Sequence, residues 1–244
     1  MKTDLIKKKY LRDGYCVVKK VFSEELINKA KLDLEEFINT NKNKYTKKQI
    51  HFANGKNVNS IHNFKDWPWI DIFKKNRSIK IIVEALLGKK NKDFGSELFA
   101  KPPKVGLAAP VHQDNYYWCI DDANALTVWI ALNDSNEKNG GIYYYKKSHK
   151  IGVLEHKSSF APGSSQTIKY LDGMNVFEVD LPKLKAGDCL IHHCLVAHGS
   201  KPNKSDQARV GCTLRYISKD SKIDKFMQQK YKKSLEKHFK KLNN

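Results

Sequence analysis

The stretch Val111-His112-Gln113-Asp114-Asn115-Tyr116-Tyr117-Trp118 decides which fold the chain is expected to adopt. Its histidine and its aspartate are two residues apart, so on an extended strand their side chains point to the same face. An imidazole and a carboxylate on one face form one edge of a metal site. A second imidazole from elsewhere in the chain would complete a two-histidine, one-carboxylate triad, which leaves coordination positions open for reactants at Fe(II).

The sequence around this stretch predicts a β-rich core. Pro102, Pro103 and Gly106 predict a loop just before the motif. From about residue 95 to residue 217, short apolar segments alternate with turn residues, which is typical of an antiparallel sandwich or barrel. The expected strands are 95–101, 126–132, 141–145, 175–179, 189–192 and 210–216.

Helices are expected on both sides of this core. Ser23 can cap a helix that runs to about Asn39, and Asn76 or Ser78 begins a second helix that Gly88 ends. A strand is expected after the Asp13-Gly14 turn, whereas residues 51–64 are expected to be irregular and to lie over the site. Residues 221–242 predict a lysine-rich amphipathic helix that packs against the core, the alternative being a helix for a partner or an anionic surface.

Length allows one large domain or two small ones, and we expect a single domain over residues 1–244, with helical support in 1–94 and the core in about 95–217. No stretch approaches the roughly 18 continuous apolar residues of a membrane span. The amino-terminal residues lack the apolar region of a secretory signal, so a cytoplasmic protein is expected. Five scattered cysteines without a C-x-x-C pair predict free thiols in a reducing compartment.

The formal charge of +19 and the isoelectric point near 9.6 raise nucleic acid and anionic membranes as partners. The excess is nearly all lysine and is spread along the chain. We therefore expect a solvated lysine surface rather than a nucleic-acid interface, with a basic face for anionic ligands as the alternative.

The second imidazole is expected from His198, which follows an apolar strand. His192 and His193 lie inside that strand and are expected to be hydrogen-bonded core residues, and the other histidines lack a partner motif. Turn residues between 199 and 208 predict a hairpin that brings Arg209 onto the strand beside His198.

Arg209 is the expected anion-binding group of the site. Because side chains alternate between the two faces of a strand, Arg209, Gly211 and Thr213 are expected together on the inner face. A guanidinium there needs a carboxylate, because burying an unpaired charge is costly. A dicarboxylic cosubstrate would satisfy it, and an internal ion pair with Asp or Glu is the alternative.

These residues resemble the phytanoyl-CoA dioxygenase type of non-haem iron, 2-oxoglutarate-dependent oxygenases. The resemblance covers roughly residues 8–218 and depends on an ordered set of motifs. The set comprises His112-Gln113-Asp114-Asn115, the segments 127–134 and 139–150, Gly187-Asp188, His198-Gly199-Ser200, and Arg209 through Tyr216.

The resemblance implies a double-stranded β-helix core of jelly-roll, cupin-like type with helices outside it. It implies Fe(II) held by His112, Asp114 and His198, with dioxygen and 2-oxoglutarate as cosubstrates and the far carboxylate of 2-oxoglutarate on Arg209, helped by Ser200. Halogenating members have a small residue in place of the carboxylate ligand, so Asp114 implies hydroxylation. The segment 140–147, Gly-Gly-Ile-Tyr-Tyr-Tyr-Lys-Lys, departs from the family pattern, and the substrate is therefore not inferred from other members.

Aromatic and basic residues near the motif are candidates for the pocket wall. Trp129 is expected beside the cosubstrate, and Tyr116, Trp118 and Lys101 beside a small or carrier-linked substrate, an anionic one being slightly favoured. The alternatives are aromatic core residues and an ordinary surface lysine. Two other functions stay open: a basic jelly-roll binding module without catalysis, and an iron oxygenase that does not use 2-oxoglutarate. No motif specifies an oligomeric state.

Overall fold

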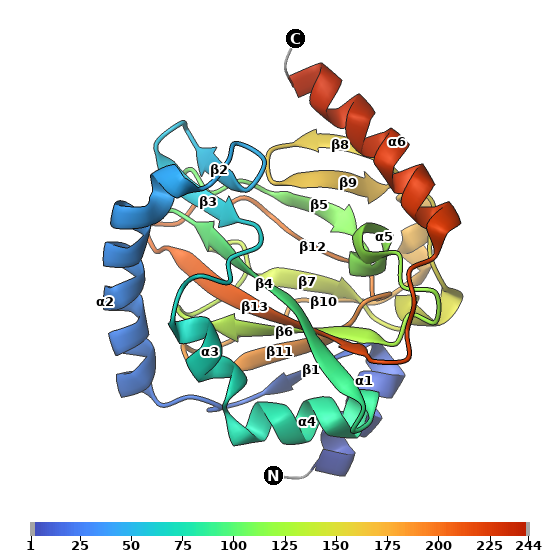
Figure 1. Cartoon of the computed structure of the whole chain (residues 1–244), viewed down its shortest axis with the longest axis horizontal. Coiled ribbons are helices and arrows are strands. Elements are labelled where there is room, and N and C mark those ends of the chain that lie inside the picture. Colours follow the sequence, from blue (N-terminus) through green and yellow to red (C-terminus); the bar gives the residue numbers. More distant parts are fainter. Residues whose placement is uncertain (1–2, 243–244) are drawn as a thin grey trace.

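Two antiparallel β-sheets and one separate hairpin form the core of the computed structural model, which describes residues 3–242 (Figure 1). The strands are β1 Tyr15–Val18, β2 Ile50–Ala53, β3 Asn57–Ile61, β4 Asn91–Lys101, β5 Ala109–His112, β6 Ala125–Ala131, β7 Ile142–Tyr145, β8 His156–Ala161, β9 Ser164–Ile168, β10 Val179–Asp180, β11 Cys189–His193, β12 His198–Ser200 and β13 Arg209–Ser218. The seven-stranded sheet has the order β1-β11-β6-β13-β4-β3-β2 and the four-stranded sheet the order β10-β7-β12-β5, while β8 pairs with β9. A mainly antiparallel core with flanking helices was predicted, and this prediction is confirmed.

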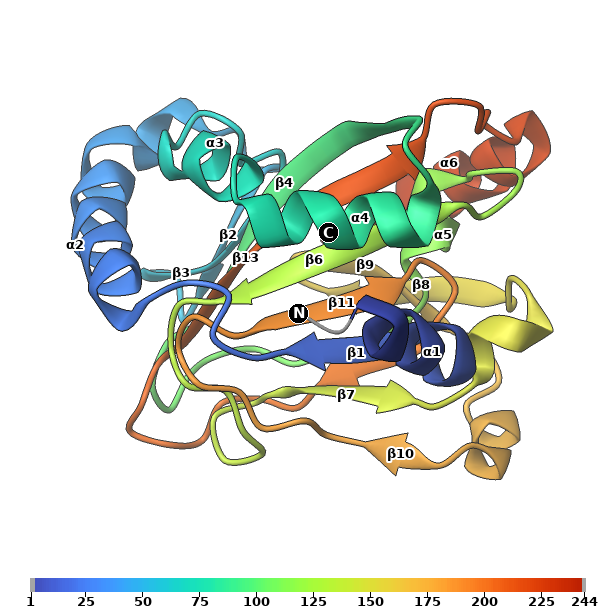
Figure 2. The ribbon, with the colours of Figure 1, turned by 90° about the horizontal axis from the view of Figure 1, so that it is seen from below.

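Helices cover the outer face of the seven-stranded sheet (Figure 2). The helices are α1 Thr3–Asp13, α2 Glu24–Asn41, α3 Trp69–Lys74, α4 Arg77–Leu87, α5 Asp114–Trp118 and α6 Lys225–Leu242, with short 3-10 turns at Lys42–Lys44, Ser148–Ile151 and Asp172–Val176. Apolar residues of α2, α3 and α4 pack in one buried cluster with residues of β4, β6, β11 and β13. This cluster leaves the opposite face of the sheet free to carry polar side chains.

Local sequence signals set the ends of the two predicted helices. The hydroxyl of Ser23 accepts the backbone N–H of Leu26 at the start of α2, and the side chain of Asn76 accepts that of Ile79 at the start of α4, both at 3.2 Å. Gly88 follows α4 with φ +86°, a conformation that favours glycine.

Strand β13 connects the apolar core with the interior of the sandwich. Cys212 and Leu214 belong to the cluster under the helices, whereas Arg209, Thr213 and Arg215 line an interior cavity. This is the predicted two-residue alternation. The inner face of the large sheet therefore supplies polar groups to the site.

One helix was missed and two local predictions were wrong. Helix α1 was not predicted, because its sequence is lysine-rich and only Tyr10 and Asp13 are buried. Residues 51–64 were expected to be irregular but contain most of the β2–β3 hairpin, although they do border the cavity. Residues 175–179 were expected as a strand, yet a 3-10 turn occupies 172–176 and only Val179 of the predicted range belongs to a strand, β10; Val176 is 80 % exposed, so no buried side chain holds the start of this range in an extended conformation.

The expected hairpin between His198 and Arg209 is also wrong. Strand β12 pairs with β5 and β7 in the small sheet, whereas β13 pairs with β4 and β6 in the large one. The buried side chain of Asn203 donates to the carbonyls of Lys101, Pro102 and Gln207, which holds the connection as it crosses between the sheets. Arg209 therefore faces the site from the sheet opposite His198.

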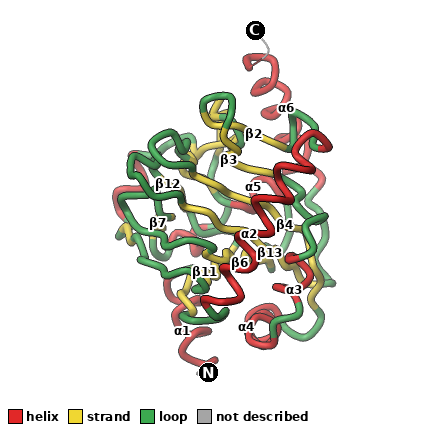
Figure 3. The backbone as a smooth tube through the Cα atoms, turned by 90° about the vertical axis from the view of Figure 1, so that its left-hand side faces the viewer, coloured by secondary structure: helices red, strands yellow, loops and turns green. Residues whose placement is uncertain are grey.

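Helix α6 packs on the β8–β9 hairpin and lies at the opposite end of the molecule from α1 (Figures 1 and 3). Ser234 of α6 bonds Ser158 and Gln166 of the hairpin. This contact agrees with the prediction of a helix packed against the core. No helix within residues 3–242 combines the length and apolar character that spanning a bilayer requires.

Candidate active site

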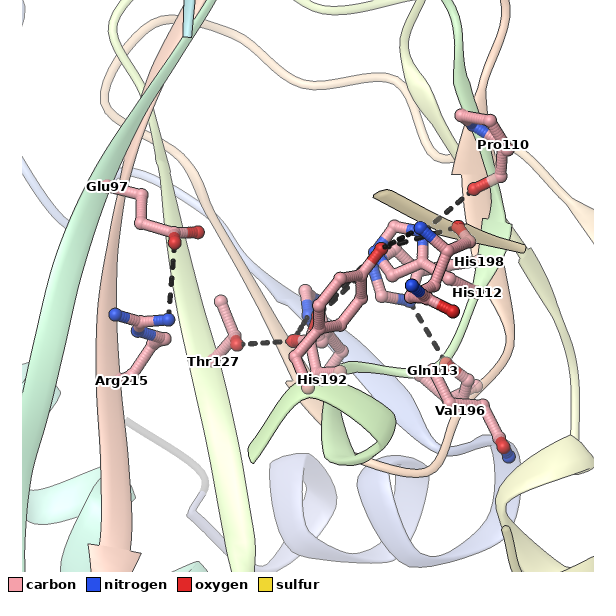
Figure 4. A network of polar contacts seen from close by, with 12 residues as sticks. Glu97, Pro110, His112, Gln113, Thr127, His192, Val196, His198 and Arg215 are labelled. Carbon is pink, nitrogen blue, oxygen red and sulfur yellow. Dashed lines mark hydrogen bonds and ion pairs between the residues drawn. The ribbon is translucent and has the colours of Figure 1, made fainter. Parts of the chain in front are cut away.

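Three side chains with metal-ligand chemistry converge between the sheets, and Figure 4 shows two of them, His112 and His198, side by side. His112 ends β5, Asp114 begins α5, and His198 begins β12 directly opposite His112 in the strand register. The Asp114 Oδ1 atom lies 3.6 Å from His112 Nε2 and 3.8 Å from His198 Nε2. One ligand atom from each residue lies within 4.8 Å of the other two, as ligands of one metal ion would.

Gln113 keeps this geometry although the motif does not lie on a single strand as expected. The residue is extended, with φ −115° and ψ 132°, so the side chains on either side of it still share a face while the helix begins at Asp114. Its fully buried amide donates to the carbonyls of Leu195 and Gly152 and accepts the N–H of Leu154. The middle residue of the motif thus anchors both ligands to the surrounding loops.

Backbone carbonyls set the tautomers of both histidine ligands. His112 Nδ1 lies 2.8 Å from the Pro110 carbonyl and His198 Nδ1 lies 3.0 Å from the Val196 carbonyl. Because a carbonyl only accepts, each Nδ1 carries the hydrogen and each Nε2 lone pair points towards Asp114. Burial, together with the neighbouring histidines, lowers the pKa of His198 to about 3, so this imidazole is neutral.

Asp114 is held by two further side chains. Its Oδ2 atom accepts from Thr127 Oγ1 at 2.7 Å and lies 3.1 Å from His192 Nε2. Burial alone would raise the pKa of the Asp114 carboxyl, but the surrounding imidazoles of His112, His192 and His198 outweigh it and hold the pKa well below its usual range. His192 is a hydrogen-bonded interior residue, as predicted, with Nδ1 2.9 Å from the Tyr144 hydroxyl. Its contact with the carboxylate was not predicted.

Arg209 is buried without an acidic partner. The side chain is 2 % exposed, and its Nε and Nη2 atoms donate to the Gly140 carbonyl at 3.1 and 2.8 Å. Among residues 3–242 no carboxylate forms an ion pair with it, so the alternative of an internal ion pair is not realised. Burial lowers the pKa of Arg209 to about 9, which leaves the guanidinium charged at neutral pH.

Trp129 and Gly211 create the space in which Arg209 lies. The guanidinium lies over the Trp129 ring, 5.4 Å from its centroid. A Cβ atom on Gly211 would come within 2.1 Å of that ring, so only glycine fits there. The Trp129 Nε1 atom is buried and has no hydrogen-bond partner in the described part of the chain, and the residue lines the cavity.

Lys101 and Ser200 lie at the same end of the cavity. Lys101 is opposite Arg209 in the register of β4 and β13, is 4 % exposed, and donates from Nζ to the carbonyls of Leu107 and Lys201. Burial, with a smaller effect from Arg209, lowers the pKa of Lys101 to about 6. Lys101 is therefore a buried amine and not an ordinary surface lysine. Ser200 is buried on β12 and lines the cavity.

The cavity has a volume of about 460 Å³ and includes most of the predicted site residues. Tyr116 is the exception: α5 turns its ring away to stack on His156 with centroids 4.1 Å apart, and Tyr117 lines the cavity instead. Residues of α6 and of the β8–β9 hairpin close one side, a wall that the sequence did not predict. The cavity residues predicted from the sequence are His112, Asp114, His198, Arg209, Ser200, Trp129, Lys101 and Trp118.

Comparison with known proteins identifies similar sequences and folds. The model of a family described as phytanoyl-CoA dioxygenase (PhyH) matches residues 10–211. A probable alpha-ketoglutarate-dependent hypophosphite dioxygenase of Stutzerimonas stutzeri is 25% identical over 228 residues, 88% of this chain and 78% of that protein. The peroxisomal phytanoyl-CoA dioxygenase of Mus musculus is 22% identical over 231 residues, 88% of this chain and 68% of that protein.

Two solved structures have a similar fold at low sequence identity. EctD from S. alaskensis with bound Fe superposes with a TM-score of 0.74 at 20% identity, covering 90% of this chain and 78% of that one. The alpha ketoglutarate dependent carbocyclase SnoK from nogalamycin biosynthesis superposes with a TM-score of 0.72 at 21% identity, covering 90% and 85%.

Proposed function

Because the chain belongs to the phytanoyl-CoA dioxygenase (PhyH) family, we propose that it is a Fe(II)- and 2-oxoglutarate-dependent oxygenase that hydroxylates an aliphatic carbon of a small-molecule substrate. The observation that carries this proposal is the pairing of two groups in one cavity. A His-Asp-His cluster offers three metal ligands, and the same space contains a buried arginine that has no carboxylate partner within residues 3–242. The names of the relatives in Stutzerimonas stutzeri and Mus musculus agree with this chemistry.

The ligand cluster fits Fe(II). The His112 and His198 imidazoles keep their Nδ1 hydrogens on backbone carbonyls and turn Nε2 towards Asp114, whose ionised carboxylate presents Oδ1 to them. Two histidines and one carboxylate on one face leave coordination positions open. Thr127 and His192 hold the other carboxylate oxygen, which fixes the direction of Oδ1.

Arg209 fits the far carboxylate of 2-oxoglutarate. Its Nη1 atom has no hydrogen-bond partner among residues 3–242, while Nε and Nη2 are held by the Gly140 carbonyl. A dicarboxylate would give this buried charge its missing counter-ion. Ser200 contributes a hydroxyl to the same cavity, and the Trp129 ring lies against the guanidinium.

Iron bound with 2-oxoglutarate supplies the oxidising chemistry, in which one oxygen atom of dioxygen enters a substrate C–H bond, the other enters succinate, and carbon dioxide is released. The residues of the chain bind and orient the reactants and exclude water from them. Tyr231, Leu235 and Phe239 of α6 close the cavity on the side of the β8–β9 hairpin. A carboxylate at position 114 supports hydroxylation over halogenation, because that ligand position is filled.

A spectroscopic experiment tests the metal site and the cosubstrate site together. Fe(II) and 2-oxoglutarate added without oxygen should give a weak visible charge-transfer band that His112→Ala and Asp114→Ala abolish. If both variants retain the band, the assignment of the ligands is wrong. Succinate release on admission of oxygen distinguishes this function from a non-catalytic basic binding module.

Arg209→Gln tests the cosubstrate site alone. Loss of a charge-assisted hydrogen bond costs about 1.5 to 3 kcal/mol, so half-saturation should need about 10 to 100 times more 2-oxoglutarate. Arg77→Gln, at an exposed arginine, is the matched control and should behave like the wild type. An unchanged requirement in Arg209→Gln would favour an iron oxygenase that does not use 2-oxoglutarate.

The expected cytoplasmic location remains part of this proposal. All five cysteines are free and buried, and the absence of disulfides among them supports a reducing compartment such as the cytoplasm.

A further inference from the structure

A second polar cluster faces the metal-ligand residues from the large sheet (Figure 4). It consists of Glu97 on β4, Arg215 on β13 and His62 just after β3. Glu97 Oε1 lies 2.9 Å from His62 Nδ1 and 3.2 Å from Arg215 Nη1. All three residues line the cavity, and the iron chemistry proposed above uses none of them.

The cluster carries a surplus positive charge. His62 Nε2 lies 3.1 Å from the Gly163 carbonyl, so both ring nitrogens face oxygen acceptors and both carry hydrogen. Burial by itself lowers the pKa of His62, but Glu97 outweighs it and the pKa is raised. Burial raises the pKa of Glu97, but Arg215 and His62 outweigh it and lower the pKa to about 2. Two cations therefore share one carboxylate.

The guanidinium of Arg215 is held in a fixed place. It lies over Gly95, where φ is +126° and a Cβ atom would come within 2.7 Å of Nη2. The rings of Phe94 and Trp118 lie 5.9 and 5.7 Å from its central carbon. Its Nη1 contacts Glu97, while Nη2 makes no hydrogen bond within residues 3–242. Nε has no hydrogen-bond partner among the described residues either, but it is buried, so Nη2 is the guanidinium nitrogen that a ligand can reach.

Arg215 lies close to the proposed iron site. Its register partner on β6 is Thr127, whose hydroxyl donates to Asp114 Oδ2. Paired Cα atoms in an antiparallel sheet are about 4.5 to 5.5 Å apart, so a molecule held at Arg215 lies beside the ligand cluster. Fe(II), Asp114, 2-oxoglutarate and Arg209 are neutral in sum, which leaves the surplus charge of the second cluster without a counter-ion.

We propose that Arg215 binds a carboxylate of the substrate, and that the substrates of this enzyme are small carboxylic acids. Glu97 is a positioning residue that orients the guanidinium, and its other oxygen faces no protein donor among the described residues. The planar guanidinium matches a carboxylate in shape and charge. The cavity of about 460 Å³, with α6 on one side, must also hold 2-oxoglutarate, so the acid is small. This inference rests on the proposed function.

Matched acids and amides test the inference in the wild-type protein. Hexanoate, 3-phenylpropanoate and N-acetylleucine, each beside its primary amide, are assayed for stimulation of succinate release with Fe(II), 2-oxoglutarate and oxygen. The acids should stimulate release at concentrations at least tenfold lower than their amides. Equal stimulation by acid and amide, or stimulation by the amides alone, would overturn the proposal.

Arg215→Gln tests the assigned residue. The acid concentration for half-maximal stimulation should rise at least tenfold, Arg215→Lys should recover part of the loss, and Arg77→Gln should match the wild type. The anaerobic band with Fe(II) and 2-oxoglutarate reports whether Arg215→Gln has folded with an intact metal site. A variant that keeps the band and the wild-type acid dependence refutes the role of Arg215.

Protection against heat covers the case in which Arg215→Gln does not fold. The acids, added to the anaerobic wild-type complex, should raise its melting temperature more than their amides do, and equal shifts overturn the proposal. Failure of the proposed function itself has a different signature, because the wild type would then give neither the band nor succinate.

Discussion

Replacement of the buried Lys101 by methionine should change how the stability of the protein depends on pH. Its amine has a pKa of about 6 in the folded protein, against about 10.4 for an unfolded lysine. Between these values the unfolded chain binds one more proton than the folded protein. The wild type therefore gains stability as pH rises through this window, and methionine removes that gain.

The size of the effect follows from one proton. The free energy of unfolding of the wild type should rise by about 1.4 kcal/mol per pH unit through Lys101 alone. The advantage of Lys101→Met over the wild type should therefore fall by about 3 kcal/mol from pH 7 to pH 9. Loss of the hydrogen bonds to the Leu107 and Lys201 carbonyls shifts the difference by an amount that does not depend on pH.

Urea denaturation of both proteins at pH 7, 8 and 9, without iron or 2-oxoglutarate, measures this difference. All other titrating groups are common to the two proteins and cancel. Lys80→Met, at an exposed lysine, should show a difference that stays flat with pH. A flat difference for Lys101→Met, or one that grows with pH, would refute a neutral buried amine.

Two further substitutions test the support of the site. Gly211→Ala should lower the free energy of unfolding by about 2 to 3 kcal/mol, because its Cβ atom would meet the Trp129 ring. In the control Gly173→Ala a Cβ atom meets nothing within 4 Å, so the cost should be less than about 0.5 kcal/mol. Equal costs of the two variants in urea denaturation would contradict this packing. Thr127→Val keeps the shape of the side chain but removes its hydrogen bond to Asp114. Fe(II) affinity, measured by titration of the anaerobic band, should therefore fall about tenfold. Unchanged affinity would mean that this hydrogen bond does not orient the Asp114 carboxylate.

The parts of the site that could be predicted are those that local sequence specifies. His112 and Asp114 could be paired from their two-residue spacing on an extended segment, and His198, which was expected as the second imidazole, lies in the same cluster. The ends of α4 followed from Asn76 and Gly88, because caps act within one turn.

The parts that could not be predicted depend on long-range contacts. The turn residues between Ser200 and Arg209 are compatible both with a hairpin and with a connection that crosses between the sheets. The crossing is held by the buried Asn203 amide, which bonds the Lys101 carbonyl about a hundred residues away in the sequence. Tyr116 was expected in the pocket because helix α5 was not foreseen at Asp114.

The β8–β9 wall escaped prediction for a different reason. His156–Ala161 and Ser164–Ile168 are polar and show no buried alternating face, so they lack the usual pattern of a strand. Their stability comes from pairing with each other and from the contacts of Ser158 and Gln166 with α6.

Helix α6 has a consequence for how such an enzyme can diverge. The ligand cluster lies between residues 112 and 198, inside the segment 10–211 that the family shares, whereas α6 begins at Lys225 and lies outside it. Insertion, loss or replacement of sequence after β13 would thus reshape one wall of the cavity and leave the iron ligands and Arg209 in place. Selection can therefore act on this terminal segment separately from the ligand cluster, so the choice of substrate can change while the oxidative chemistry is kept.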